Sequence, residues 1–300
     1  MKATTEHTVT DVVLQSKERF PFVVTPRSMT QVLQPAYTRR LRPETAEASD
    51  IDAGYPVTQT APVAWHGISD TGLVRSRNED SFSSVSLGKW SLYVVADGMG
   101  GHDAGEVASR IAVETVCRKI KEHVKQNNDP LGLIEHVVQQ ANSEVKKEGA
   151  KRGSNMGTTL SLALVADHTA YIANVGDSRV YWMENGSITQ ITRDHSLVAK
   201  LVAMGKLTKE EARNHPKSNL LYRTIGADEN IKVDTFRVDL KKGGNLMLCT
   251  DGLWGEMSDE HMHEVIFSSK DARSASEELV RMANAQGGKD NITAVVVRVT

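Results

Sequence analysis

The stretch GTTLSLALVADHTAYIANVGDSRVYWMENGSITQI, residues 157–191, decides the fold. Short polar turns separate four runs of mainly apolar residues, at 157–165, 170–174, 179–183 and 188–191. Runs of this kind between turn signals are typical of strands. The last turn is Asn185-Gly186, and Asn-Gly is a strong hairpin signal. The stretch therefore predicts a meander, in which neighbouring strands are antiparallel.

The rest of the patterned chain adds strands and pairs of helices. Further strands are expected at 65–69, 81–87, 90–96, 231–238, 245–250 and 292–299. Helical spacing of apolar residues follows Gly105 and Pro130, and it returns at 258–267 and 272–285. Strands that alternate with helix pairs, in place of single helices, indicate an α+β fold. We expect a sandwich of two antiparallel β-sheets flanked by helix pairs, in α-β-β-α layers.

Composition divides the chain into two parts. Residues 1–62 are rich in Thr, Pro, Gln and charged residues and show no sustained period, so we expect an N-terminal extension that is largely disordered. Residues 63–300 are expected to form one folded domain. Within it, the polar segment at about 194–219 fits a surface insertion between strands.

The composition also bears on partners and location. The 300 residues have a formal net charge of −2, and Lys and Arg are dispersed, which argues against nucleic acid and a membrane surface as partners. No segment approaches the length of a membrane span or a signal peptide, and neither Cys117 nor Cys249 belongs to a metal-binding motif. We expect a cytoplasmic monomer in which both cysteines pack as small apolar residues.

Four aspartates stand where a strand-like run stops or starts, each beside a residue that favours a turn. They are Asp97, Asp177, Asp251 and Asp290. Any one of them alone is explained by ordinary turn chemistry, because Asp-Gly and Asp-Asn pairs are common turn signals. Turn chemistry does not require Asp over Asn or Ser at all four. Carboxylates gathered at one end of a sheet would repel one another unless a cation neutralised them.

The donor set indicates which cation. All candidate ligands are oxygen atoms, which favours Mg²⁺ or Mn²⁺ over Zn²⁺ or copper. Two such ions about 3.5–4 Å apart can lower the pKa of a bridging water and neutralise charge on a phosphoryl group. The pattern therefore favours metal-assisted phosphate hydrolysis.

The segment VRSRNEDSF, residues 74–82, adds acidic and basic side chains just before a strand. Glu79 and Asp80 offer carboxylates, and the planar fork of Arg75 or Arg77 suits two parallel hydrogen bonds to phosphate oxygens. The alternative is that both arginines are solvated loop charges paired with Glu79 or Asp80. The spacing leaves both interpretations open.

Signatures of competing chemistries are missing. The glycine-rich run GMGGHDAG, residues 98–105, lacks the spacing of both nucleotide-binding loops. The sequence has no GxSxG elbow, and neither cysteine has the surroundings of a phosphatase nucleophile. A water molecule activated by metal is therefore favoured over a nucleophilic side chain.

Taken in order, several motifs closely resemble the bacterial branch of the metal-dependent serine/threonine protein phosphatases, the protein phosphatase 2C family. They are SRNEDSF, VVADGMGGHDAGEVAS, GTTLSLAL, ANVGDSRVY, ITRDHSL, LLYRTIG, CTDGLW and KDNITAVVV. The resemblance spans residues 65–300 and implies the sandwich expected above. It also implies hydrolysis of phosphoserine and phosphothreonine in proteins with two core Mn²⁺ or Mg²⁺ ions and a possible third.

The resemblance assigns roles to particular residues. It implies that Asp97 bridges the two core ions, that Gly98 offers its backbone carbonyl, and that Asp251 and Asp290 complete the ligands of the first ion. The remaining positions that match the family are Glu79 near the second ion, Asp80 as its neighbour, Arg75 as the phosphate-binding arginine, Asp177 at the third ion, and residues 194–219 as a flap beside the site.

One position departs from the family pattern. Where many eukaryotic members have a histidine directly after the Asp-Gly pair, this chain has Met99. His102, three residues further on, is a candidate proton donor, and an ordinary loop histidine is an equally good interpretation. The group that protonates the leaving hydroxyl is therefore left unassigned.

Two other functions remain as alternatives. A non-catalytic regulator could use the same fold to bind a partner, although none of the expected carboxylates is missing. A phosphodiesterase or nuclease would also use two metals, but the chain lacks a basic groove for nucleic acid. As partners of the phosphatase we expect phosphorylated proteins, including a cognate serine/threonine kinase or its targets.

Overall fold

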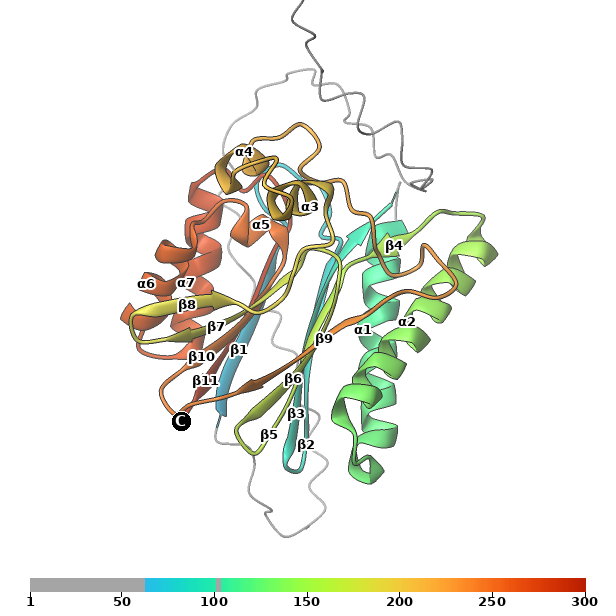
Figure 1. Ribbon diagram of the computed structural model, residues 1–300, viewed down its shortest axis with the longest axis horizontal. Coiled ribbons are helices and arrows are strands. Elements are labelled where there is room, and N and C mark those ends of the chain that lie inside the picture. Colours follow the sequence, from blue (N-terminus) through green and yellow to red (C-terminus); the bar gives the residue numbers. More distant parts are fainter. Residues whose placement is uncertain (1–62, 101–103) are drawn as a thin grey trace, which may run out of the picture. The chain divides into compact units, whose positions relative to one another are not determined.

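The computed structural model describes residues 63–100 and 104–300, and the predictions for the 1–62 extension and for His102 lie outside these ranges. Two antiparallel sheets face each other, with a helix pair on the outer face of each (Figure 1). The predicted α+β sandwich is therefore confirmed. The first sheet has the strand order β1 (Val63–Asp70), β11 (Ile292–Val299), β10 (Asn245–Cys249), β7 (Arg179–Glu184), β8 (Ser187–Gln190).

The second sheet contains the remaining strands. Its order is β2 (Asp80–Leu87), β3 (Trp90–Met99), β5 (Leu160–Ala166), β6 (Thr169–Val175), β9 (Asp234–Asp239), with the two-residue strand β4 (Gly157–Thr158) paired to the end of β3. The predicted four-strand meander is therefore wrong in one respect: β5 and β6 pair in the second sheet and β7 and β8 pair in the first, but β6 and β7 are not paired, because the chain passes from one sheet to the other between them.

Helices cover the outer faces of both sheets. On the second sheet lie α1 (Ala104–His123) and α2 (Pro130–Arg152), joined through the short 3-10 helix η2 (Val124–Gln126). On the first sheet lie α6 (Asp259–Ser268) and α7 (Ala272–Ala285). Three shorter helices lie at the upper end of the view in Figure 1, namely α3 (Leu197–Ala203), α4 (Lys209–Arg213) and α5 (Asp251–Trp254).

Local sequence explains where these helices begin and end. The side chain of Asp129 accepts a hydrogen bond from Gly132 N at the start of α2, and Pro130 takes the first helical position, where no amide donor is needed. Gly153 ends the helix in the left-handed conformation, with φ 61°. At the start of α7, the side chain of Asp271 accepts a 2.7 Å hydrogen bond from Ser274 N, as Asp129 does at the start of α2.

The core is divided into three layers. One cluster fills the space between the two sheets, including Tyr93, Ile172, Leu248 and Val295. A second cluster lies between the second sheet and helices α1 and α2, and a third between the first sheet and helices α6 and α7. Each strand at the centre of the sandwich is buried on both faces, which explains why β5 reads as a nearly continuous apolar run.

Three strand predictions need correction. The run 157–165 was predicted as one strand, but it divides into β4 and β5 because Thr159 bonds to Asp97 across the break. The run 90–96 continues to Met99, since Gly98 and Met99 pair with β4. The strand predicted at 231–238 begins three residues later, at Asp234, where pairing with β6 starts.

The segment 194–219 contains α3 and α4 and is anchored at its base. His195 Nδ1 accepts a 3.0 Å bond from Gly176 N, and Tyr222 N donates to His195 O at 2.9 Å. Arg223 donates to Asp234 at 2.9 Å and lies 2.9 Å from His195 Nε2. The two ends of the segment are therefore tied to each other and to the turn before Asp177.

Candidate metal centre

Asp97 lies inside β3, not at its end as predicted, and its backbone is held by two threonines. Its N–H donates to Thr159 Oγ1 at 2.8 Å, and its carbonyl accepts from Thr159 N and Thr158 Oγ1, each at 2.9 Å. Asp80 is its partner residue on β2. Burial raises the pKa of the Asp97 carboxyl well above its usual range, and the nearby carboxyls of Asp251, Asp80, Asp290 and Asp177 raise it further.

Asp251 begins the one-turn helix α5 immediately after β10 and Thr250. Its Oδ1 atom is buried and has no hydrogen-bond partner. Burial, followed by the charge of Asp290, raises the pKa of this carboxyl to about 6. A buried, unpartnered carboxylate oxygen is unfavourable unless a cation or donor satisfies it.

Asp290 lies two residues before β11 and forms an ion pair with Arg75. Arg75 donates to its Oδ2 atom at 2.6 Å, and Asn291 N donates to its Oδ1 atom at 2.8 Å. The alternative in which Arg75 pairs with Glu79 or Asp80 is therefore wrong, since its ion-pair partner is 215 residues away along the chain. The Arg75 side chain is about half exposed, so its guanidinium can also reach a ligand from solvent.

Asn291 fixes the loop that carries Arg75 and Glu79. Its Oδ1 accepts from Glu79 N at 2.8 Å, while its Nδ2 donates to Arg77 O at 2.8 Å and to Thr71 O at 3.0 Å. One buried amide therefore joins three points of the loop to the segment that holds Asp290.

Glu79 lies against the start of helix α1. Its backbone carbonyl accepts from Gly98 N at 3.1 Å. A Cβ atom on Gly98 would lie 2.1 Å from Gly105 O, and one on Gly105 would lie 2.9 Å from the carbonyl carbon of Gly98, so a side chain at either position would displace backbone. Burial raises the pKa of Glu79, while Arg75 opposes the shift.

Asp80 lies behind this set, in contact with neutral donors. Its Oδ2 accepts from Thr250 Oγ1 at 2.8 Å and from Thr293 Oγ1 at 2.6 Å, whereas its Oδ1 is buried without a partner. Burial raises its pKa to about 7, although the two threonine bonds oppose the shift. Threonine hydroxyls, not a cation, therefore hold this carboxyl.

Asp177 occupies the turn between β6 and β7. Burial raises its pKa well above the usual range, as do the charges of Asp251 and Asp194, while Arg179 opposes the shift. Its backbone carbonyl accepts a 3.0 Å bond from Trp254 Nε1. The turn thus meets helix α5 directly.

These residues fit a hard cation by chemistry and electrostatics. The candidate ligands are all oxygens, and mutual repulsion and burial raise the pKa values of Asp97, Asp177 and Asp251. Within residues 63–100 and 104–300, no three His, Cys, Asp or Glu side chains are arranged to hold a metal ion as they stand. The argument that a hard cation fits here therefore rests on the oxygen donors, the repulsion among the carboxylates and the unpartnered Asp251 Oδ1.

Several residues that hold the site were missed by sequence reasoning. They are Thr158, Thr159, Arg179, Thr250, Trp254, Asn291 and Thr293. All but Thr158 and Thr159 lie within three residues of a predicted aspartate. That proximity was the available signal, but the partners lie on other strands.

Neither cysteine provides a nucleophile. Cys249 is buried in β10, and Cys117 is partly buried on α1. Burial raises the pKa values of both thiols, which disfavours the thiolate. The structure thus agrees with the prediction that both pack as small apolar residues.

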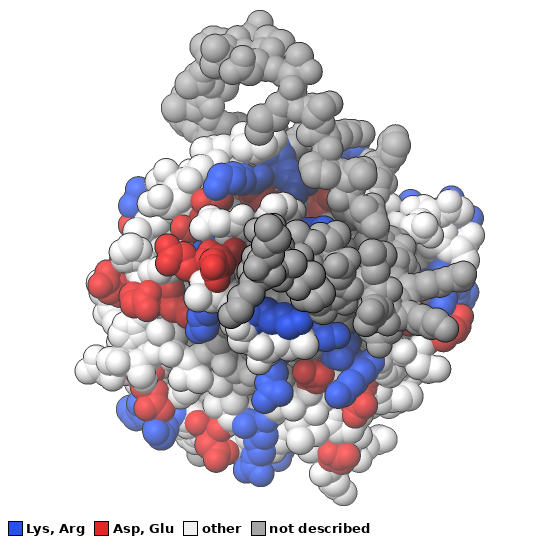
Figure 2. Space-filling view, turned by 45° about the horizontal axis from the view of Figure 1, so that its top comes forward, with Lys and Arg blue, Asp and Glu red and all other residues white. Residues whose placement is uncertain are grey.

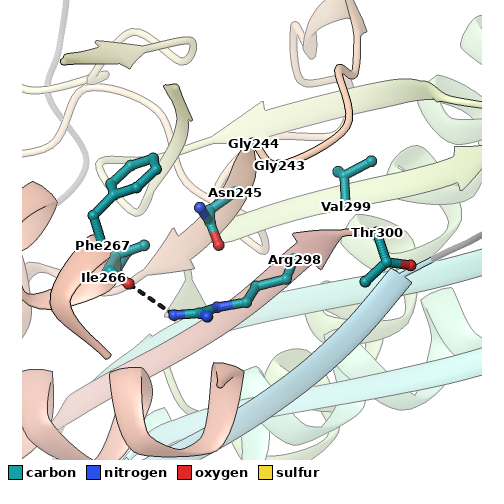
Figure 3. A pocket seen from close by; sticks show the side chains of 8 residues that line it. All are labelled: Gly243, Gly244, Asn245, Ile266, Phe267, Arg298, Val299 and Thr300. Atoms are coloured by element: carbon teal, nitrogen blue, oxygen red, sulfur yellow. Dashed lines mark hydrogen bonds between the residues drawn. The ribbon is translucent and has the colours of Figure 1, made fainter. Parts of the chain in front are cut away.

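Charged side chains and a small cavity also lie away from the carboxylates. The face shown in Figure 2 carries both acidic and basic side chains, with acidic ones gathered left of centre and basic ones from the centre toward the lower edge. A cavity of about 190 Å³ lies beside Asn245 and Arg298, at the opposite ends of β10 and β11 from Asp251 and Asp290 (Figure 3). Arg298 donates there to Ile266 O at 2.7 Å and to Ser269 O at 2.8 Å, so it caps the end of α6. Among the described helices, none is long and apolar enough to cross a membrane.

Comparison with known proteins places this geometry in a family. A profile described as protein phosphatase 2C matches residues 74–296. The serine/threonine phosphatase stp of Listeria innocua is 37% identical over 233 residues, which cover 76% of this chain and 92% of that protein. The solved Mycobacterium tuberculosis serine/threonine phosphatase PstP/Ppp has a TM-score of 0.72 at 33% identity, covering 79% of this chain and 98% of that one.

A further solved structure contains metal. It is the catalytic domain of the serine/threonine protein phosphatase PstP in complex with two manganese ions, with a TM-score of 0.72 at 32% identity, covering 79% of this chain and 98% of that one. The fold, the ordered motifs and these similarities agree. The chain therefore belongs to the protein phosphatase 2C family and is a phosphoprotein phosphatase.

Proposed function

We propose that this phosphatase hydrolyses phosphoserine and phosphothreonine in proteins, using two core Mn²⁺ or Mg²⁺ ions. The observation that carries the proposal is the buried set of repelling carboxylates, with an unpartnered Asp251 Oδ1, beside the half-exposed Arg75. The similarity to a phosphatase domain solved with two manganese ions supports it. Phosphorylated proteins are the proposed partners, and a cognate kinase or its targets stay a prediction among them.

The ligand assignments follow the resemblance to the family, and the burial and mutual repulsion of the carboxylates support them. Asp97, the Gly98 carbonyl, Asp251 and Asp290 would hold one core ion, and Asp97 would bridge to a second ion near Glu79. Asp177 would serve an accessory third ion. When bound, such ions lower the pKa of a water molecule and neutralise charge on a phosphoryl group.

Asp80 supports the ligands without needing to bind an ion itself. Its Oδ2 atom accepts from Thr250, which precedes Asp251, and from Thr293 on β11. These bonds connect the strand that follows Glu79 with the two strands that deliver Asp251 and Asp290. Asp80 therefore fixes the relative positions of segments that carry proposed ligands.

Arg75 would bind the phosphate. Its guanidinium is held by Asp290 through one nitrogen, NH2, and its side chain is about half exposed. A planar guanidinium can donate two parallel bonds to phosphate oxygens, which a lysine cannot do. Asp290 would thus orient the arginine as well as contribute to the metal set. His102 stays a predicted proton donor for the leaving hydroxyl, outside the described residues.

The test is phosphate release from a phosphothreonine peptide with Mn²⁺, with excess EDTA, and in Asp97→Asn and Asp251→Asn. These changes keep side-chain shape and remove charge. Asp239→Asn is the matched control, because Asp239 is exposed at the end of β9. We expect activity to disappear with EDTA and in both site variants but to persist in the control. Activity that survives chelation or either site change would refute the proposal.

A further inference from the structure

Arg179 stands at the centre of a contact network beside the proposed metal centre. Its Nε and NH2 atoms donate to the carboxylate of Asp194, with the shortest contact at 2.7 Å. Its NH1 atom donates to Tyr181 Oη at 2.8 Å. The face of the guanidinium lies 3.5 Å from the ring centroid of Trp254. Three nitrogens of this largely buried cation therefore have acceptors, and one face of it packs on the indole of Trp254.

Trp254 connects two segments that carry proposed ligands. It is the last residue of α5, whose first residue is Asp251, so the two side chains lie on the same helical turn. Its Nε1 atom donates to the backbone carbonyl of Asp177 at 3.0 Å. Through this one indole, the turn that bears Asp177 is fixed relative to the turn that bears Asp251.

The position of that carbonyl matters because Asp177 lies in a sharp turn. The preceding Gly176 has φ 104°, and a Cβ there would lie 2.6 Å from the side chain of Thr159. His195 holds Gly176 N at 3.0 Å. His195 N also donates to Gly176 O at 3.0 Å, so the peptide before Asp177 is held by His195 and the carbonyl after it by Trp254.

We propose that Trp254 is a positioning residue for the Asp177 carboxylate, with Arg179 holding the indole at the angle that the hydrogen bond requires. The inference rests on the proposed function, in which Asp177 serves the accessory ion. Trp254 itself offers no metal ligand. Its contribution is to fix the position of the Asp177 carboxylate relative to that of Asp251.

The test is Trp254→Phe, which keeps one aromatic ring for Arg179 and removes the N–H donor together with part of the indole volume; the control variant loses the same volume. Trp182→Phe is the matched control, because Trp182 Nε1 donates to Glu184 at 3.0 Å on β7, outside the proposed centre. Protein-bound Mn²⁺ is counted by the loss of the free-ion signal in electron paramagnetic resonance as Mn²⁺ is added. Asp177→Asn identifies which part of the binding curve belongs to the accessory ion.

In Trp254→Phe we expect the affinity of the accessory phase to fall about threefold to tenfold, the range for loss of one ordinary hydrogen bond. The core phase and the thermal midpoint should match those of Trp182→Phe. Phosphatase activity should recover when Mn²⁺ is raised, which separates weaker metal activation from a lower kcat.

Three results would overturn the inference. An accessory phase unchanged from the unaltered protein would show that the indole donor does not position Asp177. Equal weakening of core and accessory phases, or a midpoint far below that of the control, would show a general structural role. Absence of Mn²⁺ binding by the unaltered protein would overturn the proposed function as well, so the two failures are distinguishable.

Discussion

The metal-free protein should lose stability as the pH rises from about 5 to about 7, because burial raises the pKa values of several carboxyls, namely those of Asp80, Asp97, Asp177 and Asp251. Burial raises the pKa of the Asp80 carboxyl to about 7, whereas an unfolded aspartate titrates near about 4. The folded state therefore holds the proton more tightly than the unfolded state. The resulting stabilisation is complete below about pH 4 and is lost as the pH rises through about 7.

The magnitude follows from the two pKa values. Between them, each pH unit removes about 1.4 kcal/mol of stability for one carboxyl, so Asp80 alone accounts for about 2 kcal/mol between about pH 5 and pH 7. Asp251, with a pKa of about 6, acts in the same direction, but the two titrations are coupled and do not add. His66 and His195 act in the opposite direction, because burial lowers their pKa values.

A comparison with Asp80→Asn separates these contributions, because both histidines are present in both proteins. Urea unfolding of the metal-free proteins, followed by circular dichroism at several pH values, gives the free energy of unfolding. We expect the free energy of unfolding of Asp80→Asn to rise by about 2 kcal/mol relative to that of the unaltered protein between about pH 5 and pH 7. Saturating Mn²⁺ should flatten the pH dependence of the unaltered protein. A difference that stays constant with pH, or that moves in favour of Asp80, would refute the reasoning.

Three further substitutions test how the site is held. Thr159→Val removes the acceptor of Asp97 N–H and should destabilise the protein by about 1–3 kcal/mol in urea unfolding, while Thr159→Ser should not. Gly105→Ala should lower stability in the same assay, although helix propensity alone predicts a gain of about 1 kcal/mol, because its Cβ would lie 2.9 Å from the carbonyl carbon of Gly98 on β3. Asn291→Ala should reduce kcat/KM for a phosphothreonine peptide and cost at least about 1 kcal/mol of stability; unchanged kinetics would contradict its proposed role in fixing the Arg75 loop.

The parts of the molecule that could be predicted are those determined by residues close together in the sequence. Apolar runs of strand length and the turn residues between them predicted the hairpins β5–β6 and β7–β8, and helical spacing predicted both helix pairs, but a continuous meander was wrong because β6 and β7 belong to different sheets. Asp177, Asp251 and Asp290 were found because each stands next to such a run. The order of strands within the sheets was not predictable in this way, since it depends on packing between the three apolar layers.

The residues that could not be predicted act across long stretches of chain. Asn291 bonds to a loop more than 200 residues earlier, and Asp80 is held by Thr250 and Thr293. Periodicity describes neighbours in sequence, so it contains no information about these pairs. The break at Thr159 was missed for a related reason, because an apolar run predicts an unbroken strand even where a side chain is needed to hold Asp97.

The way the carboxylates are held explains why the cluster still fits a cation. Threonine hydroxyls hold Asp80, and the bonds that hold Asp97 reach its backbone, so neither set of contacts neutralises a charge. Arg75 pairs with Asp290 at the edge of the cluster, and its guanidinium is the group that the proposed function requires for phosphate. Full pairing of the carboxylates with buried lysines or arginines would satisfy them internally and remove the driving force for metal. Neutral bonds instead fix the positions of the oxygens while leaving the negative charge uncompensated, which is the condition under which a divalent ion stabilises the fold as it completes the site.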